Sequence, residues 1–139
     1  MRITSRASDY ALLLLTHLAS LPENEASNVK KIGEELHLSV RFLANIANKL
    51  GTAKIIFANR GAGGGIKLGK PAHEISVQEV IESVEGPIQT MFCQNTNDLC
   101  HHETHCSMKH FWDGVQDVVI DKLKTTMIAD LVGKKQYAV

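Results

Sequence analysis

Residues 39–68, SVRFLANIANKLGTAKIIFANRGAGGGIKL, decide the fold of this chain. In the first half, apolar residues recur at helical spacing after Ser39, which predicts a helix capped by that serine and stopped at Gly51. Its inward-facing residues are Leu43, Ile46, Ala47 and Leu50. The second half has two short β-forming runs separated by glycines, which predicts a hairpin. The stretch therefore pairs a helix with a short hairpin.

The helix after Ser39 has a polar and basic exposed face, with no carboxylate anywhere in residues 39–50. That face carries Arg41, Ala44, Asn45, Asn48 and Lys49. Asn and Arg side chains can read base edges, while Lys and a helix N-terminus can hold phosphate. An ordinary solvated helix face has similar residues, so this face indicates DNA binding only together with the hairpin that follows.

The predicted hairpin joins residues 55–57 to residues 66–68 through ANRGAGGG, with Arg60 at its tip. Four glycines leave the backbone free to adopt positive φ and to approach another molecule closely. Arginine in a narrow minor groove reads DNA shape, as expected of the wing in a winged helix. A nucleotide phosphate loop would instead lead directly into a helix, and here the glycines lead into a second strand.

Upstream of this stretch, a short helix is expected from Ser27 or Asn28 to Leu36. His37 and Leu38 form a tight connection to the helix after Ser39. Two short helices joined in this way fit a helix-turn-helix, although many helical hairpins that bind no DNA share the pattern. In support of a polyanion site, residues 28–70 contain eight basic and two acidic residues, whereas the whole chain has net charge zero.

Two more helices are expected to complete the compact part. The first is capped by Ser8 and closed by Pro22, and the second begins at a capping box of Ser76 with Glu79 and stops at Gly86. Their inward-facing residues are Ala11, Leu14, Leu15 and Leu18 in the first, and Val77, Val80, Ile81 and Val84 in the second.

All three cysteines lie in residues 93–106, CQNTNDLCHHETHC, together with three of the seven histidines. The segment has no apolar periodicity, so something other than a core is expected to order it. Thiolates backed by imidazoles suit soft metals. An iron–sulfur cluster, a structural zinc and unligated redox-sensing thiols all fit these residues. An odd cysteine count favours the reduced thiols of a cytosol over a secreted disulfide framework.

The chain has 139 residues, of which 44% are hydrophobic, enough for one domain with an appended element. No stretch is long enough to span a membrane. A long helix is expected from near Ser107, and its apolar stripe predicts either core or a dimer seam. The stripe consists of Trp112, Val115, Val119 and Leu123, with Phe111 and Val118 beside it.

Six features together resemble the bacterial winged-helix regulators typified by the iron–sulfur cluster regulator IscR and the nitric-oxide-sensitive repressor NsrR. They are MRITSRASDYAL, SVRFLANIANKL, NRGAGGGIKL, EISVQEVIESVEG, the three cysteines and TMIADLV. The resemblance covers essentially the whole chain. It implies a homodimer joined through the long C-terminal helix, with double-stranded operator DNA as partner. It also implies a cluster, 2Fe–2S or 4Fe–4S, on Cys93, Cys100 and Cys106.

Two departures from the family pattern concern the metal ligands. Six residues separate Cys93 from Cys100, against a usual five. Where IscR-type members place a ligand histidine, three residues after the last cysteine, this chain has Lys109. NsrR-type members use an aspartate of the partner subunit near the N-terminus, which corresponds to Asp9 after a one-residue shift. The resemblance orders the candidate fourth ligands as Asp9, His110, His105, His102 and His101.

The expected architecture is mostly α with a small β-hairpin. It comprises a winged helix-turn-helix domain (1–87), a cysteine-rich cluster-binding loop (88–107), and a dimerisation helix with its tail (108–139). The expected DNA-binding residues are Ser39, Val40, Arg41, Asn45, Asn48, Lys49, Arg60 and Gly63.

We expect a cytoplasmic, homodimeric transcriptional repressor whose cluster senses redox state, nitric oxide or iron supply. The alternatives are a zinc- or thiol-based regulator on the same scaffold and, in a different class, a small iron–sulfur electron-transfer protein. Paired carboxylates, a nucleophile elbow and a nucleotide loop are all missing from the sequence. An enzyme, a small-molecule substrate and a membrane partner are therefore not expected.

Overall fold

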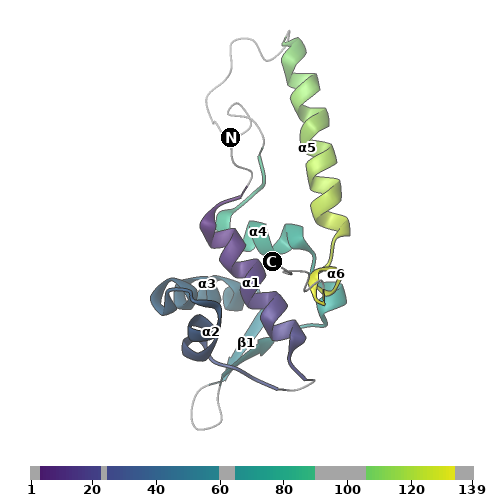
Figure 1. Cartoon of the computed structure of the whole chain (residues 1–139). Helices are drawn as coiled ribbons and strands as arrows, with labels where there is room; N and C mark the ends of the chain where they lie inside the picture. Colours follow the sequence, from purple (N-terminus) through teal and green to yellow (C-terminus); the bar gives the residue numbers. More distant parts are fainter. Residues whose placement is uncertain (1–3, 23–24, 60–64, 90–105, 134–139) are drawn as a thin grey trace, which may run out of the picture.

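The computed structural model of the chain describes residues 4–22, 25–59, 65–89 and 106–133. The elements are α1 (Arg6–Ser20), α2 (Val29–Leu36), α3 (Val40–Thr52), β1 (Ile56–Asn59), β2 (Gly65–Leu68), the 3-10 helix η1 (Ala72–Glu74), α4 (Val77–Glu85), α5 (Ser107–Thr125) and α6 (Ile128–Leu131). A mostly helical chain with one small hairpin is therefore confirmed. Figure 1 shows α1 to α4, α6 and the hairpin gathered into one body, from which α5 extends away.

Helix α1 runs through the centre of the body and packs against α3, α4 and α6. Its predicted inward face is buried, since Ala11, Leu14 and Leu15 are 0% exposed. The predicted N-cap is wrong, because the helix begins one turn earlier and the side chain of Ser5 accepts a hydrogen bond from the backbone N–H of Ala7. Ser8 instead lies inside the helix, where it is fully buried.

The helix-turn-helix of α2 and α3 is closed by local hydrogen bonds. Asn28 caps α2 by accepting from the N–H of Lys31 at 2.8 Å. His37 turns the chain in the left-handed region, with φ of 56°. Ser39 caps α3 by accepting from the N–H of Phe42 at 3.3 Å. Each cap satisfies a backbone donor that the first turn leaves without a helical partner.

Helix α3 ends later than the predicted stop at Gly51. Gly51 lies within the helix, which continues to Thr52. The chain turns at Lys54, whose φ is 61°. The N–H of Lys54 bonds the carbonyl of Gly51, and the N–H of Ile55 bonds that of Leu50, at 3.0 Å each. Because these bonds hold the turn, Lys54 adopts a conformation that glycine would favour.

The hairpin is antiparallel, with Ile56 opposite Leu68 and Asn59 opposite Gly65. Ser27 exchanges two backbone hydrogen bonds with Ile66, of 3.0 and 2.6 Å, and so forms an isolated antiparallel β-bridge with β2. This approach explains the glycine at position 65, because a Cβ there would collide with the carbonyl oxygen of Ser27. The hairpin is thereby fixed to the body.

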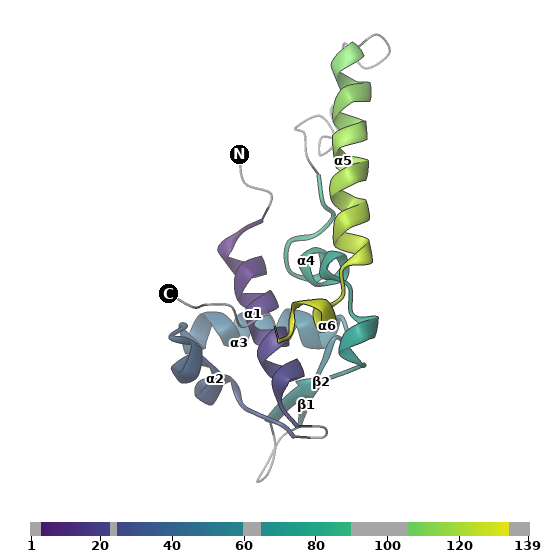
Figure 2. The same cartoon turned by 45° about the vertical axis from the view of Figure 1, so that its right-hand side comes forward.

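Helix α4 follows η1 and begins with the predicted capping box of Ser76 and Glu79. It ends at Gly86, whose φ is 86°. Val77, Ile81 and Ile88 form a second, smaller core that also packs against Ile120 and Leu123 of α5. Helix α5 thus meets the body through its C-terminal part (Figure 2).

Within α5, no described residue is buried. The predicted stripe of Trp112, Val115, Val119 and Leu123 is half-buried. Beside it, Met108, Phe111 and Val118 are 65%, 63% and 70% exposed. After α5 the chain returns to the body, where Ile128 of α6 is 0% exposed. In the part of the chain that the structure describes, no helix is both long and apolar enough to cross a membrane.

Candidate nucleic-acid interface and metal centre

Helix α3 presents its predicted polar face to solvent. Arg41, Asn45 and Asn48 are all exposed, and the opposite face is anchored by Leu43 and Leu50, which are 0% exposed. A surface hollow of about 490 Å³ lies at the start of the helix. It is lined by Ser39, Arg41, Phe42 and Asn45. The predicted base-reading side chains therefore share one open, acid-free surface with the N-terminus of the helix.

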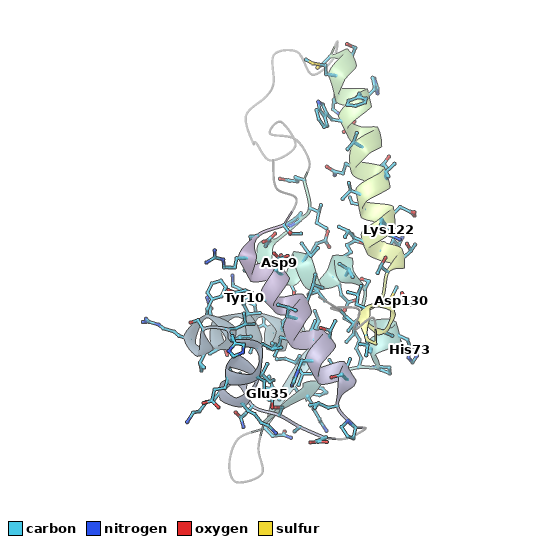
Figure 3. All side chains as sticks on the ribbon, in the orientation of Figure 1. Asp9, Tyr10, Glu35, His73, Lys122 and Asp130 are labelled. Atoms are coloured by element: carbon cyan, nitrogen blue, oxygen red, sulfur yellow. The ribbon has the colours of Figure 1, made fainter. Side chains whose placement is uncertain are left out.

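The ring of Phe42 lies between this surface and α1. Tyr10 of α1 meets Phe42 with ring centroids 5.4 Å apart and planes at 82°, which is the edge-to-face arrangement that aromatic quadrupoles favour. In Figure 3, Tyr10 and Asp9 lie on the same end of α1. The pair was not predicted, because a contact between two aromatic residues 32 positions apart leaves no local pattern in the sequence.

Val40, at the first position of α3, is 40% exposed and adds an apolar contact to the same end of the helix. An exposed valine there suits the methyl group of thymine. Phe57 on β1 is 51% exposed and pairs across the hairpin with Lys67. Phe57 was not among the DNA-binding residues predicted from the sequence. Arg60 and Gly63 lie outside the described residues, and their contact with DNA stays a prediction.

The side chain of Lys49 has a partner within the protein, whereas a DNA phosphate was expected. Its ammonium donates a hydrogen bond to the backbone carbonyl of Val84, at 3.2 Å, in a partly buried contact between α3 and α4. The contact of Lys49 with a DNA phosphate, expected from the sequence, stays a prediction. The structure gives the side chain a protein partner near the end of α4.

Two of the four predicted metal ligands lie among the described residues. Cys106 is unpaired and partly exposed, and it occupies the N-cap position of α5. Asp9 is exposed in the first turn of α1, where its carboxylate accepts a hydrogen bond of 3.4 Å from the hydroxyl of Thr4. Cys93 and Cys100 lie outside the described residues.

The positions of Asp9 and Cys106 bear on how they could share a metal. Both views show α5 beginning at its end remote from the body, whereas α1 belongs to the body. The described residues hold no group of three or more His, Cys, Asp or Glu side chains arranged for a metal. Both donors are nonetheless accessible and of suitable chemistry, because thiolates are the usual cluster ligands. The two described donors therefore have the chemistry of cluster ligands, and the described residues do not bring them together within one chain.

Of the histidines that could supply the fourth ligand, one lies among the described residues and three do not. His110 is exposed in the first turn of α5, four residues after Cys106. His101, His102 and His105 lie outside the described residues. His17, which is not a ligand candidate, lies 3.1 Å from Glu35, between α1 and α2.

The family model for Rrf2, described as iron-dependent transcriptional regulator, matches residues 4–134. Several solved structures share the fold across nearly the whole chain. The CymR protein of B. subtilis, described as its global cysteine regulator, is 26% identical with a TM-score of 0.76, covering 94% of this chain and 96% of that one. The oxidised form of Staphylococcus aureus CymR is 30% identical with a TM-score of 0.75, covering 96% and 97%. The T. potens IscR is 23% identical with a TM-score of 0.73, covering 92% and 84%, and shows likeness of fold.

Proposed function

The chain belongs to the Rrf2 family of transcriptional regulators, and we propose that it is a homodimeric repressor whose grip on operator DNA is controlled by an iron–sulfur cluster. The resemblance to IscR- and NsrR-type regulators is thereby confirmed at the level of the family. Rrf2 regulators are DNA-binding proteins and not enzymes, so the expectation of no catalytic activity also holds. As an operator-binding protein it would act in the cytoplasm.

The observation that carries DNA binding is the exposed face of α3. Arg41 and Asn45 project from a helix whose other face is packed into the core. Side chains on a rigid helix can be placed in a major groove with one defined register. Residues 39–50 contain no carboxylate that would repel phosphate. We assign Ser39, Val40, Arg41, Asn45 and Asn48 to the bases, and Arg60 and Gly63 to the minor groove.

The dimer is supported by α5. Its exposed Met108, Phe111 and Val118 form an apolar surface that is large for a helix outside the body. A second copy of α5 would cover it, with the same residues contributed by both chains around a two-fold axis. The two α3 helices would then face successive half-sites of a palindrome.

The cluster would be held by Cys93, Cys100 and Cys106, with Asp9 of the partner subunit as the fourth ligand. A cluster with three thiolates and one carboxylate oxygen supplies one iron that is more open to displacement than the others. The partner's Asp9 suits this role because, within one chain, α1 and the start of α5 lie apart. Cys106 would position the cluster at the N-terminus of the same helix that forms the dimer.

A second candidate function is thiol-based control on the same scaffold, without iron. It is favoured by the similarity to the CymR structures, one of them described as an oxidised form, at 26% and 30% identity. In that case oxidation of Cys93, Cys100 or Cys106 would replace cluster loss as the signal. In a third candidate, the same cysteines would hold a zinc ion in place of the cluster.

The test begins with anaerobic purification and counts of iron, sulfide and zinc. Duplexes are then selected from a random pool by the loaded and the metal-stripped protein, and the affinity of each form for the selected duplex is measured. Iron and sulfide with a palindromic duplex and unequal affinities are expected. A colourless protein whose DNA binding responds to peroxide would support the thiol candidate. Failure of both forms to bind any duplex would overturn the proposal.

A further inference from the structure

The last turn of α4 packs against the recognition helix in the core, and Lys49 adds a side-chain hydrogen bond between them. Lys49 Nζ donates to the carbonyl oxygen of Val84 at 3.2 Å. That carbonyl is among the last four of α4, which have no partner within the helix. A cation at this end also complements the negative end of the helix dipole. Val84 is 7% exposed whereas Lys49 is exposed, so the hydrogen bond lies at the edge of the core, in a partly buried position.

The next residue, Glu85, makes the second connection. Its Oε1 accepts a hydrogen bond of 2.9 Å from the backbone N–H of Ser5, the N-cap of α1. Ser5 lies four residues before Asp9, the proposed fourth ligand of the partner's cluster. Two consecutive residues of α4 therefore hold the recognition helix on one side and the start of α1 on the other.

These two residues also lie just before the cysteines. After Glu85 the chain turns at Gly86, and Ile88, only 8% exposed, is held between α4 and α5. Cys93 follows five residues after Ile88. Buried Ile88 thereby ties the chain that leads to the cysteines to α4. A shift of the cysteine segment would therefore be passed to the end of α4.

We propose that Lys49 is a positioning residue, which transmits the state of the cysteine segment to the recognition helix through the carbonyl of Val84. This inference rests on the proposed function, because it requires that DNA binding depends on the occupancy of the cysteines. Displacement of the α4 end moves the bonded ammonium, and with it the last turn of α3. Lys49 would thus act on DNA affinity through helix placement, in place of the phosphate contact predicted from the sequence.

The test is Lys49→Met, which keeps the aliphatic stem and removes the donor. Operator affinity is measured for the metal-loaded and the metal-stripped protein over a range of salt concentrations. The ratio of the two affinities is expected to be about tenfold or more in the wild type, the usual size of such couplings. In Lys49→Met it should fall to about twofold or less, with the salt dependence of binding unchanged.

A phosphate contact would behave differently. Both forms of Lys49→Met would then weaken by the same factor, and the slope of log affinity against log salt would fall by about 0.9. That result, or an unchanged ratio, would overturn the inference. If the metal-loaded and metal-stripped wild-type proteins bind the operator with equal affinity, cluster control is absent and the inference falls with it. This outcome needs no variant, so it is distinguished from a failure of the inference alone.

Two further variants keep the test secure. Lys49→Arg retains a donor for the Val84 carbonyl and should preserve most of the ratio, whereas loss of the ratio with intact folding would count against a positioning role. Lys124→Met removes the same charge from the exposed last turn of α5 and should leave the ratio unchanged. If Lys49→Met proves unstable, amide exchange of residues 46–52 in the wild-type protein decides. It should differ between loaded and stripped forms, and identical exchange would contradict the coupling.

Discussion

The edge of one aromatic ring meets the face of another between Tyr10 of α1 and Phe42 of α3, with centroids 5.4 Å apart. The pair supports the recognition helix on the side that faces α1. Phe42 directly follows Arg41, which lies on the exposed surface. It also places the backbone of α1 beside α3, on the same helical turn that carries Asp9. The proposed DNA-reading surface is therefore braced by α1, the helix that carries Asp9, the proposed fourth ligand of the partner's cluster.

Replacing Phe42 with leucine should show the value of this brace. Phe42→Leu keeps most of the apolar volume but loses the aromatic pair, worth about 0.5–1.5 kcal/mol beyond burial. We expect the free energy of unfolding, measured by urea denaturation, to fall by about 1 kcal/mol. Phe57→Leu is the matched control, because that ring is 51% exposed. Equal losses in both variants would contradict a special role for the pair.

Ser8 offers a stabilising substitution. It is 0% exposed, and its hydroxyl has no hydrogen-bond partner among the described residues. A buried hydroxyl without a partner costs about 1–3 kcal/mol, and alanine also has the higher helix propensity. Ser8→Ala should therefore raise the free energy of unfolding by about 1 kcal/mol.

The contrasting serine is Ser76, whose side chain accepts from the N–H of Glu79 at 3.1 Å. Ser76→Ala should lower the free energy of unfolding by about 1 kcal/mol, as loss of an N-cap does. Denaturation of the two variants side by side checks both signs. A destabilised Ser8→Ala would show that its hydroxyl has a partner in solution.

Base reading by α3 can be separated from phosphate binding. Asn45→Ala should weaken binding to the selected operator by about 1–3 kcal/mol, the value of one good base contact, and leave binding to unrelated DNA unchanged. Fluorescence anisotropy with both duplexes makes the comparison. Gln78→Ala removes an amide from α4, where it bonds Glu82 at 3.3 Å, and serves as control. A uniform loss on both duplexes would assign Asn45 to the DNA backbone.

The fourth ligand is tested by metal content. Cys106→Ala should abolish the cluster, because only two thiolates remain. Asp9→Ala should give a cluster that is lost within a purification, whereas His110→Ala should retain wild-type iron and sulfide. Counts of both elements and the visible spectrum under anaerobic conditions check these outcomes. Retention in Asp9→Ala with loss in His110→Ala would reverse the assignment.

The assembly through α5 has its own variant. Val118 is 70% exposed in the single chain, and Val118→Asp would place a charge in the proposed seam. Burial of an unpaired carboxylate is strongly unfavourable, so the protein should become monomeric in sedimentation and lose cooperative operator binding. Lys124→Asp introduces the same side chain away from that stripe and should remain dimeric. A dimeric Val118→Asp protein would place the interface elsewhere.

Much of the fold follows from signals within one or two helical turns. The caps Asn28, Ser39 and Ser76 were readable because an N-cap bonds a backbone N–H two or three residues along the chain. The hairpin was readable from β-forming runs around glycines. Ser8 and Gly51 were misassigned because both residue types also occur inside helices, where burial or neighbouring turns determine their conformation.

The sequence by itself determined the helix-turn-helix, the hairpin, the polar face of α3 and the gathering of all cysteines in one segment, because each depends on local spacing. Only the tertiary structure decided that Lys49 bonds Val84, that Tyr10 meets Phe42 and that Glu85 holds Ser5. These contacts join residues 32 to 80 positions apart. A long side chain takes the partner that packing brings within reach, and no local pattern carries that choice.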